Sequence, residues 1–126
     1  MSLFSECQAA LSGDFEIIEG ERLCVAIDTF HRYPFHNEGL LWSQMDFTDF
    51  ELVDERLYEL AFGHEDVYVI ADDAYVPVFK SNFRLILDNI YDVMALSPKL
   101  FIFNNKIMMQ PLFPHYTIRV GCMREE

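Results

Sequence analysis

Residues 81–96 (SNFRLILDNIYDVMAL) constrain the fold more than any other segment of the chain. Their apolar side chains recur three and four residues apart, which is the spacing that gives an α-helix one wide apolar face. This face comprises Phe83, Ile86, Leu87, Ile90, Val93 and Met94. On the opposite face Arg84 and Asp88 form an i,i+4 pair, and Pro98 ends the helix. Such a helix needs a second apolar layer, which the rest of the chain must supply.

Strand patterns on both sides of this helix supply that layer. Residues 66–71 (DVYVIA) are rich in β-branched side chains and end at an Asp-Asp turn. A short strand is also expected at residues 14–19. The last third of the chain predicts three more strands, at residues 100–103, 107–110 and 116–123. Asn104 and Asn105 favour a tight turn between the first two of these because Asn tolerates positive φ.

Two further helices are expected near the start of the chain. Residues 3–12 carry apolar side chains at helical spacing, and Gly13 is suited to ending that helix. Residues 21–32 suit both a helix and a buried strand. The length of this segment and the position of Pro34 after it favour the helix.

The acidic segment 48–60 also predicts a helix. It begins with the T-x-x-E capping pattern, in which Thr48 caps the helix and Glu51 lies three residues further on. Its apolar face consists of Phe50, Val53, Leu57 and Leu60. Residues 40–47, just before it, suit a short strand or an extended lead-in to the helix.

Length and aromatic content predict one packed domain. A chain of 126 residues buries roughly two thirds of the surface that it exposes when unfolded. Its 12 Phe, 6 Tyr and 1 Trp provide large apolar groups for a core. No internal repeat or linker divides the sequence. We therefore expect a single α+β domain over residues 1–126, with a mostly antiparallel sheet packed against two to three helices.

Acidic residues are concentrated in the first part of the chain. Residues 1–73 hold 17 acidic and 3 basic residues, whereas residues 74–126 hold 4 acidic and 6 basic residues. The excess is densest between residues 46 and 73, where 10 acidic residues accompany Arg56 alone. The overall net charge of −12 repels phosphate backbones and anionic lipids, so neither nucleic acid nor a membrane is expected as a partner. Basic macromolecules are the favoured partners.

Several features favour a soluble protein of the cytoplasm. The three cysteines have no CxxC spacing, which argues against a disulfide framework and a thiolate zinc site. The first twenty residues contain no Lys or Arg and no long apolar run, so a signal peptide is not expected. The longest segment without Asp, Glu, Lys or Arg has 12 residues (107–118), against roughly 20 needed to span a bilayer.

No pattern in the sequence identifies a catalytic or metal site. His31 and His36 are five residues apart around a proline, which matches no common metal-binding motif. There is no GxSxG elbow, phosphate-binding loop or dinucleotide fingerprint. We therefore expect a non-enzyme without catalytic residues, metal or cofactor. Two alternatives stay open: a small hydrolase or metal-dependent enzyme that uses His64 with Asp66, Asp72 or Asp73, and a structural adaptor subunit marked by an apolar surface patch.

The acidic segment is the candidate binding surface. On the expected helix, Glu51, Glu55 and Glu59 would line up at i, i+4 and i+8, although like charges at this spacing destabilise a helix. The acidic run continues beyond the helix, and Tyr58, an aromatic residue that can anchor an interface, lies within it. The candidate residues are Asp46, Asp49, Glu51, Asp54, Glu55, Tyr58, Glu59, Glu65, Asp66, Asp72 and Asp73.

The run from about Trp42 to Phe103 resembles the small acidic immunity proteins of bacterial polymorphic toxin systems, in particular those of contact-dependent growth inhibition. The resemblance lies in the acidic segment, DVYVIADD, YVPVF, SNFRLILDNIYDVMAL and KLFIF. It implies a cytoplasmic inhibitor that binds one cognate toxin domain, commonly a nuclease such as an RNase or tRNase, and occludes its active site. In such an interface the candidate aromatic anchors are Trp42, Tyr58, Tyr68 and Tyr75.

Overall fold

The computed structural model describes residues 3–36, 39–52, 54–59, 65–73, 75–112 and 117–123. Within these ranges the chain forms a seven-stranded sheet, a two-stranded sheet and five α-helices. The elements follow the order α1 (Leu3–Ala10), β1 (Phe15–Ile17), α2 (Glu21–His31), β2 (Phe35–His36), β3 (Gly39–Leu40), the 3-10 helix η1 (Trp42–Gln44), β4 (Met45–Glu51), α3 (Glu55–Glu59), β5 (Asp66–Ala71), β6 (Phe79–Asn82), α4 (Phe83–Asp88), α5 (Ile90–Met94), β7 (Leu100–Phe103), β8 (Met108–Pro111) and β9 (Thr117–Met123).

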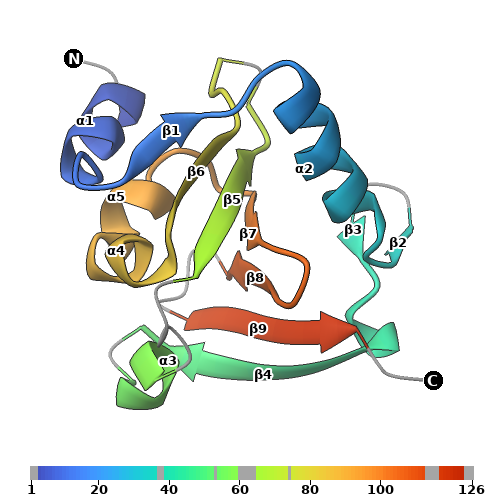
Figure 1. The fold of residues 1–126 in the computed structure, drawn as a ribbon. Helices are drawn as coiled ribbons and strands as arrows, with labels where there is room; N and C mark the ends of the chain where they lie inside the picture. Colours follow the sequence, from blue (N-terminus) through green and yellow to red (C-terminus); the bar gives the residue numbers. More distant parts are fainter. Residues whose placement is uncertain are drawn as a thin grey trace.

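The large sheet is antiparallel throughout. Its strand order is β1-β6-β5-β7-β8-β9-β4, so β1 and β4 are its edges. Helices α1, α4 and α5 lie on one side of the sheet, whereas α2 and the small β2–β3 sheet lie on the other (Figure 1). The expected α+β class with a mostly antiparallel sheet is confirmed. Among the described residues, no helix is both long and apolar enough to cross a membrane.

Two apolar clusters form the core, one on each face of the central strands. Leu100 and Ile102 of β7 belong to the cluster that includes α4 and α5, whereas Phe101 and Phe103 belong to the cluster beside α2. All four side chains are buried because successive residues of a strand point to opposite faces. The apolar run LFIF is thus explained by a strand covered on both faces.

Most predicted elements are present in the structure. The expected helices over residues 3–12 and 21–32 correspond to α1 and α2, and the expected strands correspond to β1, β5, β7, β8 and β9. The turn after β7 is held by Asn104, whose side-chain oxygen accepts hydrogen bonds from the N–H groups of Lys106 (2.8 Å) and Ile107 (3.0 Å). The sequence does not predict β6 or the β2–β3 pair.

The helix predicted over residues 81–96 is shorter and divided. Ser81 and Asn82 end strand β6, and the Asn82 side chain caps α4 by accepting hydrogen bonds from the N–H groups of Arg84 (2.9 Å) and Leu85 (3.3 Å). Asn89, at φ −125° and ψ 31°, separates α4 from α5. The apolar face nevertheless keeps its role, since the side chains of Phe83, Ile86, Leu87, Ile90 and Val93 are buried.

The helix predicted over residues 48–60 is wrong. Residues Met45–Glu51 form the edge strand β4, and of the residues of this segment that the structure describes, only Glu55–Glu59 are helical. Strand β9 pairs with β4 along its whole length, with Thr48 opposite Val120, and this long-range pairing overrides the local T-x-x-E signal. As a result, Glu51 does not share a helix with Glu55 and Glu59.

Gly121 of β9 is a position where the packing requires glycine. A Cβ atom there would lie 2.8 Å from the backbone oxygen of Asp46, 2.9 Å from Cζ3 of Trp42 and 3.0 Å from Cβ of Phe47. We expect Gly121→Ala to destabilise the protein by about 1–3 kcal/mol, the usual effect of overpacking. Gly39→Ala is the matched control, because nothing lies within 4 Å of its Cβ position. Thermal unfolding measures both, and equal melting temperatures for the two variants would contradict this packing.

Candidate functional site

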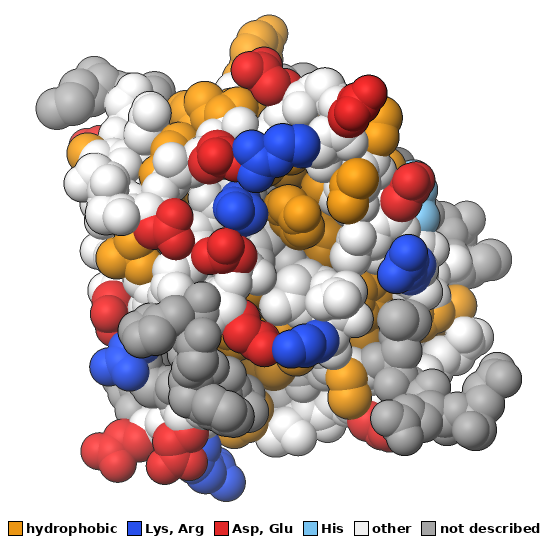
Figure 2. Space-filling view, viewed as in Figure 1, with side chains coloured by type: hydrophobic (Ala, Val, Ile, Leu, Met, Phe, Trp, Pro, Cys, Tyr) orange, Lys and Arg blue, Asp and Glu red, His pale blue; other side chains and the backbone are white. Residues whose placement is uncertain are grey.

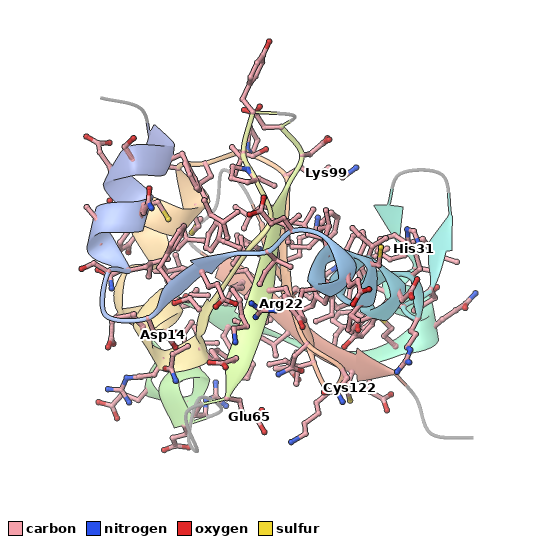
Figure 3. The ribbon with its side chains drawn as sticks, turned by 45° about the horizontal axis from the view of Figure 1, so that its top comes forward. Asp14, Arg22, His31, Glu65, Lys99 and Cys122 are labelled. Atoms are coloured by element: carbon pink, nitrogen blue, oxygen red, sulfur yellow. The ribbon has the colours of Figure 1, made fainter. Side chains whose placement is uncertain are left out.

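The structure separates the candidate acidic residues into three places. Most of them lie where α3, the end of β4 and the start of β5 come together, and we call this group the α3 surface. Its acidic members are Asp49, Glu51, Asp54, Glu55, Glu59, Glu65 and Asp66. Asp46 lies near the other end of β4, opposite Cys122, while Asp72 and Asp73 follow the far end of β5. Figure 3 places Glu65 beside α3 and Lys99, next to Asp72, at the opposite end of the molecule.

Basic residues of the chain itself neutralise part of the α3 surface. Three of them come from the second, more basic part of the sequence and reach acidic partners of the first part. Figure 2 accordingly shows basic and acidic side chains side by side on this face. The pairs are Asp49–Arg119 (2.7 Å), Asp54–Arg56 (2.8 Å), Glu65–Lys106 (2.7 Å) and Asp66–Lys80 (3.3 Å).

Three carboxylates of the α3 surface stay outside these pairs. Glu51, Glu55 and Glu59 are exposed, and none of them forms an ion pair within the described ranges. Glu51 ends β4, and the two others lie at the two ends of the short helix α3. Asp54 has a structural role here, since its carboxylate accepts a hydrogen bond from the Arg56 N–H (2.9 Å) at the start of α3. The strongest candidates for contact with a basic partner are therefore these three glutamates.

Arg119 organises the edge of the sheet next to this surface. Its guanidinium donates two hydrogen bonds to Asp49, at 2.7 and 3.1 Å, directly across the β4–β9 pair. It also lies 4.5 Å from the ring centre of Phe47 and 5.6 Å from that of Trp42. The indole N–H of Trp42 donates to Gln110 (3.1 Å). This guanidinium holds the pKa of Asp49 below its usual value, chiefly through the side-chain hydrogen bond.

Asp72 and Asp73 lie in the loop after β5. The N–H of Asp72 donates to the backbone oxygen of Lys99 (2.9 Å), and the Asp73 carboxylate accepts from the N–H of Tyr75 (2.9 Å). Tyr75 is 93% exposed, which is extreme for a large aromatic side chain. Among the expected anchors, Trp42 and Tyr68 are half-buried and packed against the core, and the Tyr58 side chain lies outside the description. Tyr75 is thus the anchor candidate that the fold leaves most accessible.

The described residues include only the carboxylates of the hydrolase alternative. His64 lies outside the described residues. Asp66 begins β5 and Asp72 follows its end, so the two carboxylates are roughly 20 Å apart at about 3.3 Å per residue and cannot share one reacting atom. Within the described part of the chain, no three His, Cys, Asp or Glu side chains are grouped to hold a metal ion.

The adaptor alternative predicts an apolar patch on the surface. The large apolar side chains that are exposed in the described part of the chain come from β1, α2, β4, the loop after β5, and α5. They are Ile17, Val25, Phe47, Tyr75 and Tyr91. Single exposed apolar residues of this kind are normal on soluble domains. These five side chains come from five different parts of the described chain.

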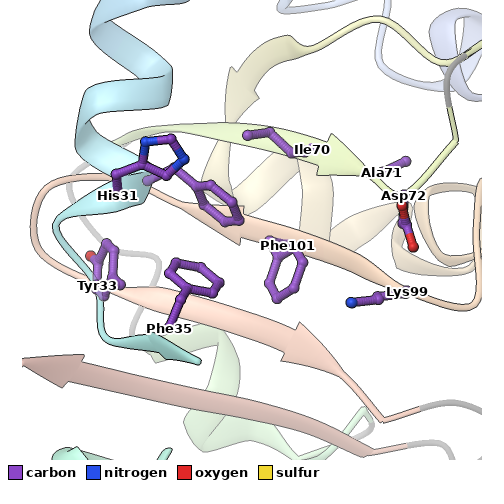
Figure 4. Close-up of a pocket in the computed structure, with 9 residues that line it drawn as sticks. His31, Tyr33, Phe35, Ile70, Ala71, Asp72, Lys99 and Phe101 are labelled. Atoms are coloured by element: carbon purple, nitrogen blue, oxygen red, sulfur yellow. The ribbon is translucent and has the colours of Figure 1, made fainter. Parts of the chain in front are cut away.

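The sequence does not predict a pocket that the fold forms near Asp72. It has a volume of about 600 Å³ and lies between the end of α2, the end of β5 and the start of β7 (Figure 4). Its lining residues are Phe30, His31, Tyr33, Phe35, Ile70, Ala71, Asp72, Lys99 and Phe101. One signal was available in the sequence: the alternation in LFIF puts Phe101 on the face opposite Leu100, where FHRYPF supplies further rings.

Replacing Arg119 tests how much its contacts stabilise the edge of the sheet beside the α3 surface. We expect Arg119→Met to lower the free energy of unfolding by about 1 kcal/mol, because the variant loses the contact of the guanidinium with two rings and an ion pair. The ion pair gives the smaller share, since the Asp49 side chain is 43% exposed and water screens it. Arg22→Met is the control, because its pair with Glu16 is exposed on both sides. Its melting temperature should not change measurably.

The pH dependence gives a second readout for the same variant. Because the pKa of Asp49 is lowered in the folded protein, its ion pair stabilises the fold above the ordinary carboxyl pKa of about 3.9. This contribution disappears as the pH falls through the lowered pKa. The stability difference between wild type and Arg119→Met should therefore shrink below pH ~4 in denaturant titrations. A difference that grows on acidification would contradict the assigned pair.

A comparison with known families assigns the chain to a family over almost its whole length. A family model described as CdiI immunity protein, EcoliA0-like, matches residues 1–121, almost the whole chain. A search of curated proteins finds no match. The earlier resemblance to immunity proteins of contact-dependent growth inhibition is confirmed. The chain belongs to the CdiI immunity proteins of contact-dependent growth inhibition systems.

Proposed function

We propose that this immunity protein binds one copy of a cognate basic toxin domain, a nuclease such as an RNase or tRNase, and covers its active site. It acts in the cytoplasm by binding alone, without catalysis, nucleic acid or membrane. The toxin-contacting residues of this proposal are those of the α3 surface, together with Asp46, Asp72, Asp73 and Tyr58.

One observation carries this proposal: Glu51, Glu55 and Glu59 are exposed and outside the ion pairs of the described residues. A nuclease must present a positive surface to its phosphate substrate. Carboxylates outside the ion pairs of the described residues are available to this surface, and a net charge of −12 steers a basic domain toward the protein. The glutamates would then lie where the phosphates of the substrate otherwise bind.

Charge reversal at the α3 surface tests the steering. The double variant Glu51→Lys and Glu55→Lys should associate with the toxin about tenfold more slowly at low salt, because electrostatic complementarity acts mainly on the association rate. The salt dependence of the rate should also become weaker. Stopped-flow mixing with the toxin domain encoded beside the immunity gene measures both quantities.

A control with the same change in net charge separates local from global effects. Glu6→Lys with Glu19→Lys alters two exposed carboxylates on α1 and after β1, away from α3. This variant should slow association much less. Equal slowing in the two double variants would show that net charge alone steers the toxin and would remove the α3 surface from the proposal.

Tyr75 tests the contribution of an aromatic anchor. We expect Tyr75→Ala to weaken toxin binding at least tenfold through faster dissociation, as truncated hot-spot residues do. Its melting temperature should stay constant because the side chain is 93% exposed. Tyr91→Ala on α5, where the side chain is 58% exposed, is the matched control and should bind as wild type. Unchanged affinity of Tyr75→Ala in surface plasmon resonance would exclude Tyr75 from the interface.

A further inference from the structure

The pocket beside Asp72 has walls that are already fixed in place. Phe30 packs against Phe35, with ring centres 4.6 Å apart, and against Phe101 at 5.1 Å. Phe35 and Phe101 meet edge to face at 6.0 Å. The hydroxyl of Tyr33 donates to the backbone oxygen of Asn104 (2.6 Å), which ties this side of the pocket to the turn after β7. With about 600 Å³, the pocket has the size of pre-formed ligand sites, roughly 300–1,000 Å³.

Polar groups lie at both ends of these aromatic walls. His31 and Tyr33 lie at one end, and Asp72 and Lys99 lie together at the other (Figure 4). The hydrogen bond from the Asp72 N–H to the Lys99 backbone oxygen (2.9 Å) keeps these two residues adjacent. The Asp72 carboxylate is suited to accept an N–H, and the Lys99 ammonium is suited to donate to a carbonyl or hydroxyl oxygen.

The opposite charges of Asp72 and Lys99 determine which kind of partner side chain the pocket favours. A guanidinium or ammonium would be attracted by Asp72 but repelled by Lys99, so it gains little. A neutral aromatic ring gains edge-to-face or stacked contacts with Phe30, Phe35 and Phe101. Tyr and Trp also carry a polar atom that can bond to one of the pocket's polar ends. The pocket therefore suits an aromatic residue better than a basic one, unlike the α3 surface.

We propose that this pocket receives a Tyr or Trp side chain of the toxin domain, an inference that rests on the proposed function. Buried aromatic anchors in such pockets dominate the affinity of many interfaces. Strand β5 joins the pocket to the α3 surface, and its six residues span roughly 20 Å. A standard interface covers about 800 Å² per partner, or about 30 Å across, so one toxin domain can reach both. In this arrangement the acidic residues set the association rate, and the pocket slows dissociation.

Small probes test the chemistry of the pocket on the intact protein. N-acetyl-tyrosinamide and N-acetyl-tryptophanamide should cause saturable NMR shifts at the amides of residues 70–72 and 101. Their affinity should exceed that of N-acetyl-argininamide at least fivefold. In Lys99→Gln the argininamide affinity should rise several-fold, because the repelling charge is gone. The absence of saturable shifts, or equal binding of argininamide in the wild type, would overturn the inference.

Filling the pocket tests its role with the toxin itself. Ile70→Trp adds an aromatic ring from a half-buried strand position that lines the pocket. It should weaken toxin binding at least tenfold. Ile17→Trp on the edge strand β1 makes the same exchange at a 39% exposed site and should leave binding unchanged. NMR spectra and melting temperatures check that both variants are folded.

The results separate the two levels of the proposal. If the wild type binds the toxin and Ile70→Trp binds equally well, the pocket inference fails and the proposed function stands. If the wild type does not bind the toxin encoded beside it, the proposed function fails and the pocket's role as an anchor site fails with it. Tenfold weaker binding of Ile70→Trp, with Ile17→Trp as wild type, supports the inference.

Discussion

The burial of strand β7 on both faces is the constraint on which the rest of the structure depends. Leu100 and Ile102 are covered by the layer of α4 and α5, and Phe101 and Phe103 by the layer of α2 and β2. A strand that is apolar on both faces cannot lie at an edge or face water, so the sheet must extend on either side of it. The extension ends in β1 and β4. The same burial places Phe101 near the start of β7, where it becomes a wall of the pocket.

The antiparallel sheet also decides which acidic residues stay available to a partner. Along the sequence, acidic and basic residues are separated, but β9 brings Arg119 opposite Asp49, and β6 brings Lys80 next to Asp66. Opposite charges across paired strands stabilise a sheet modestly. The asymmetry in the sequence therefore overstates the negative potential of the surface. On the α3 surface, the carboxylates that remain outside the ion pairs of the described residues are Glu51 and the two glutamates of α3.

Periodicity predicted the elements whose signal is local. The helices at residues 3–12 and 21–32 and the strands at residues 66–71 and 100–103 follow from spacing, breakers and β-branched content. The segment 48–60 could not be assigned in this way. Its T-x-x-E signal is genuine, but it competes with pairing to β9, about 70 residues away in the sequence, and such pairing is invisible to a local pattern.

The sequence predicted which residues of the candidate site are acidic, but not how the fold groups them. Acidic residues could be identified by composition, but their grouping depended on the wrong helix, and so Glu51 was aligned with Glu55 and Glu59 for a reason that does not hold. The ion pairs that neutralise Asp49 and Asp66 are long-range contacts. The pocket joins residues 30–35, 70–72 and 99–101 and exists only after the sheet is assembled.

Hydrogen exchange of the immunity protein with and without its toxin domain tests the central claim most directly. The account predicts slower exchange on complex formation in β4, α3 and the end of β5, together with the segment around Phe35. Exchange in α1, α4 and α5 should be the same in the free and bound protein, because these helices cover the side of the sheet opposite the pocket. Protection confined to α1, α4 and α5 would contradict the account.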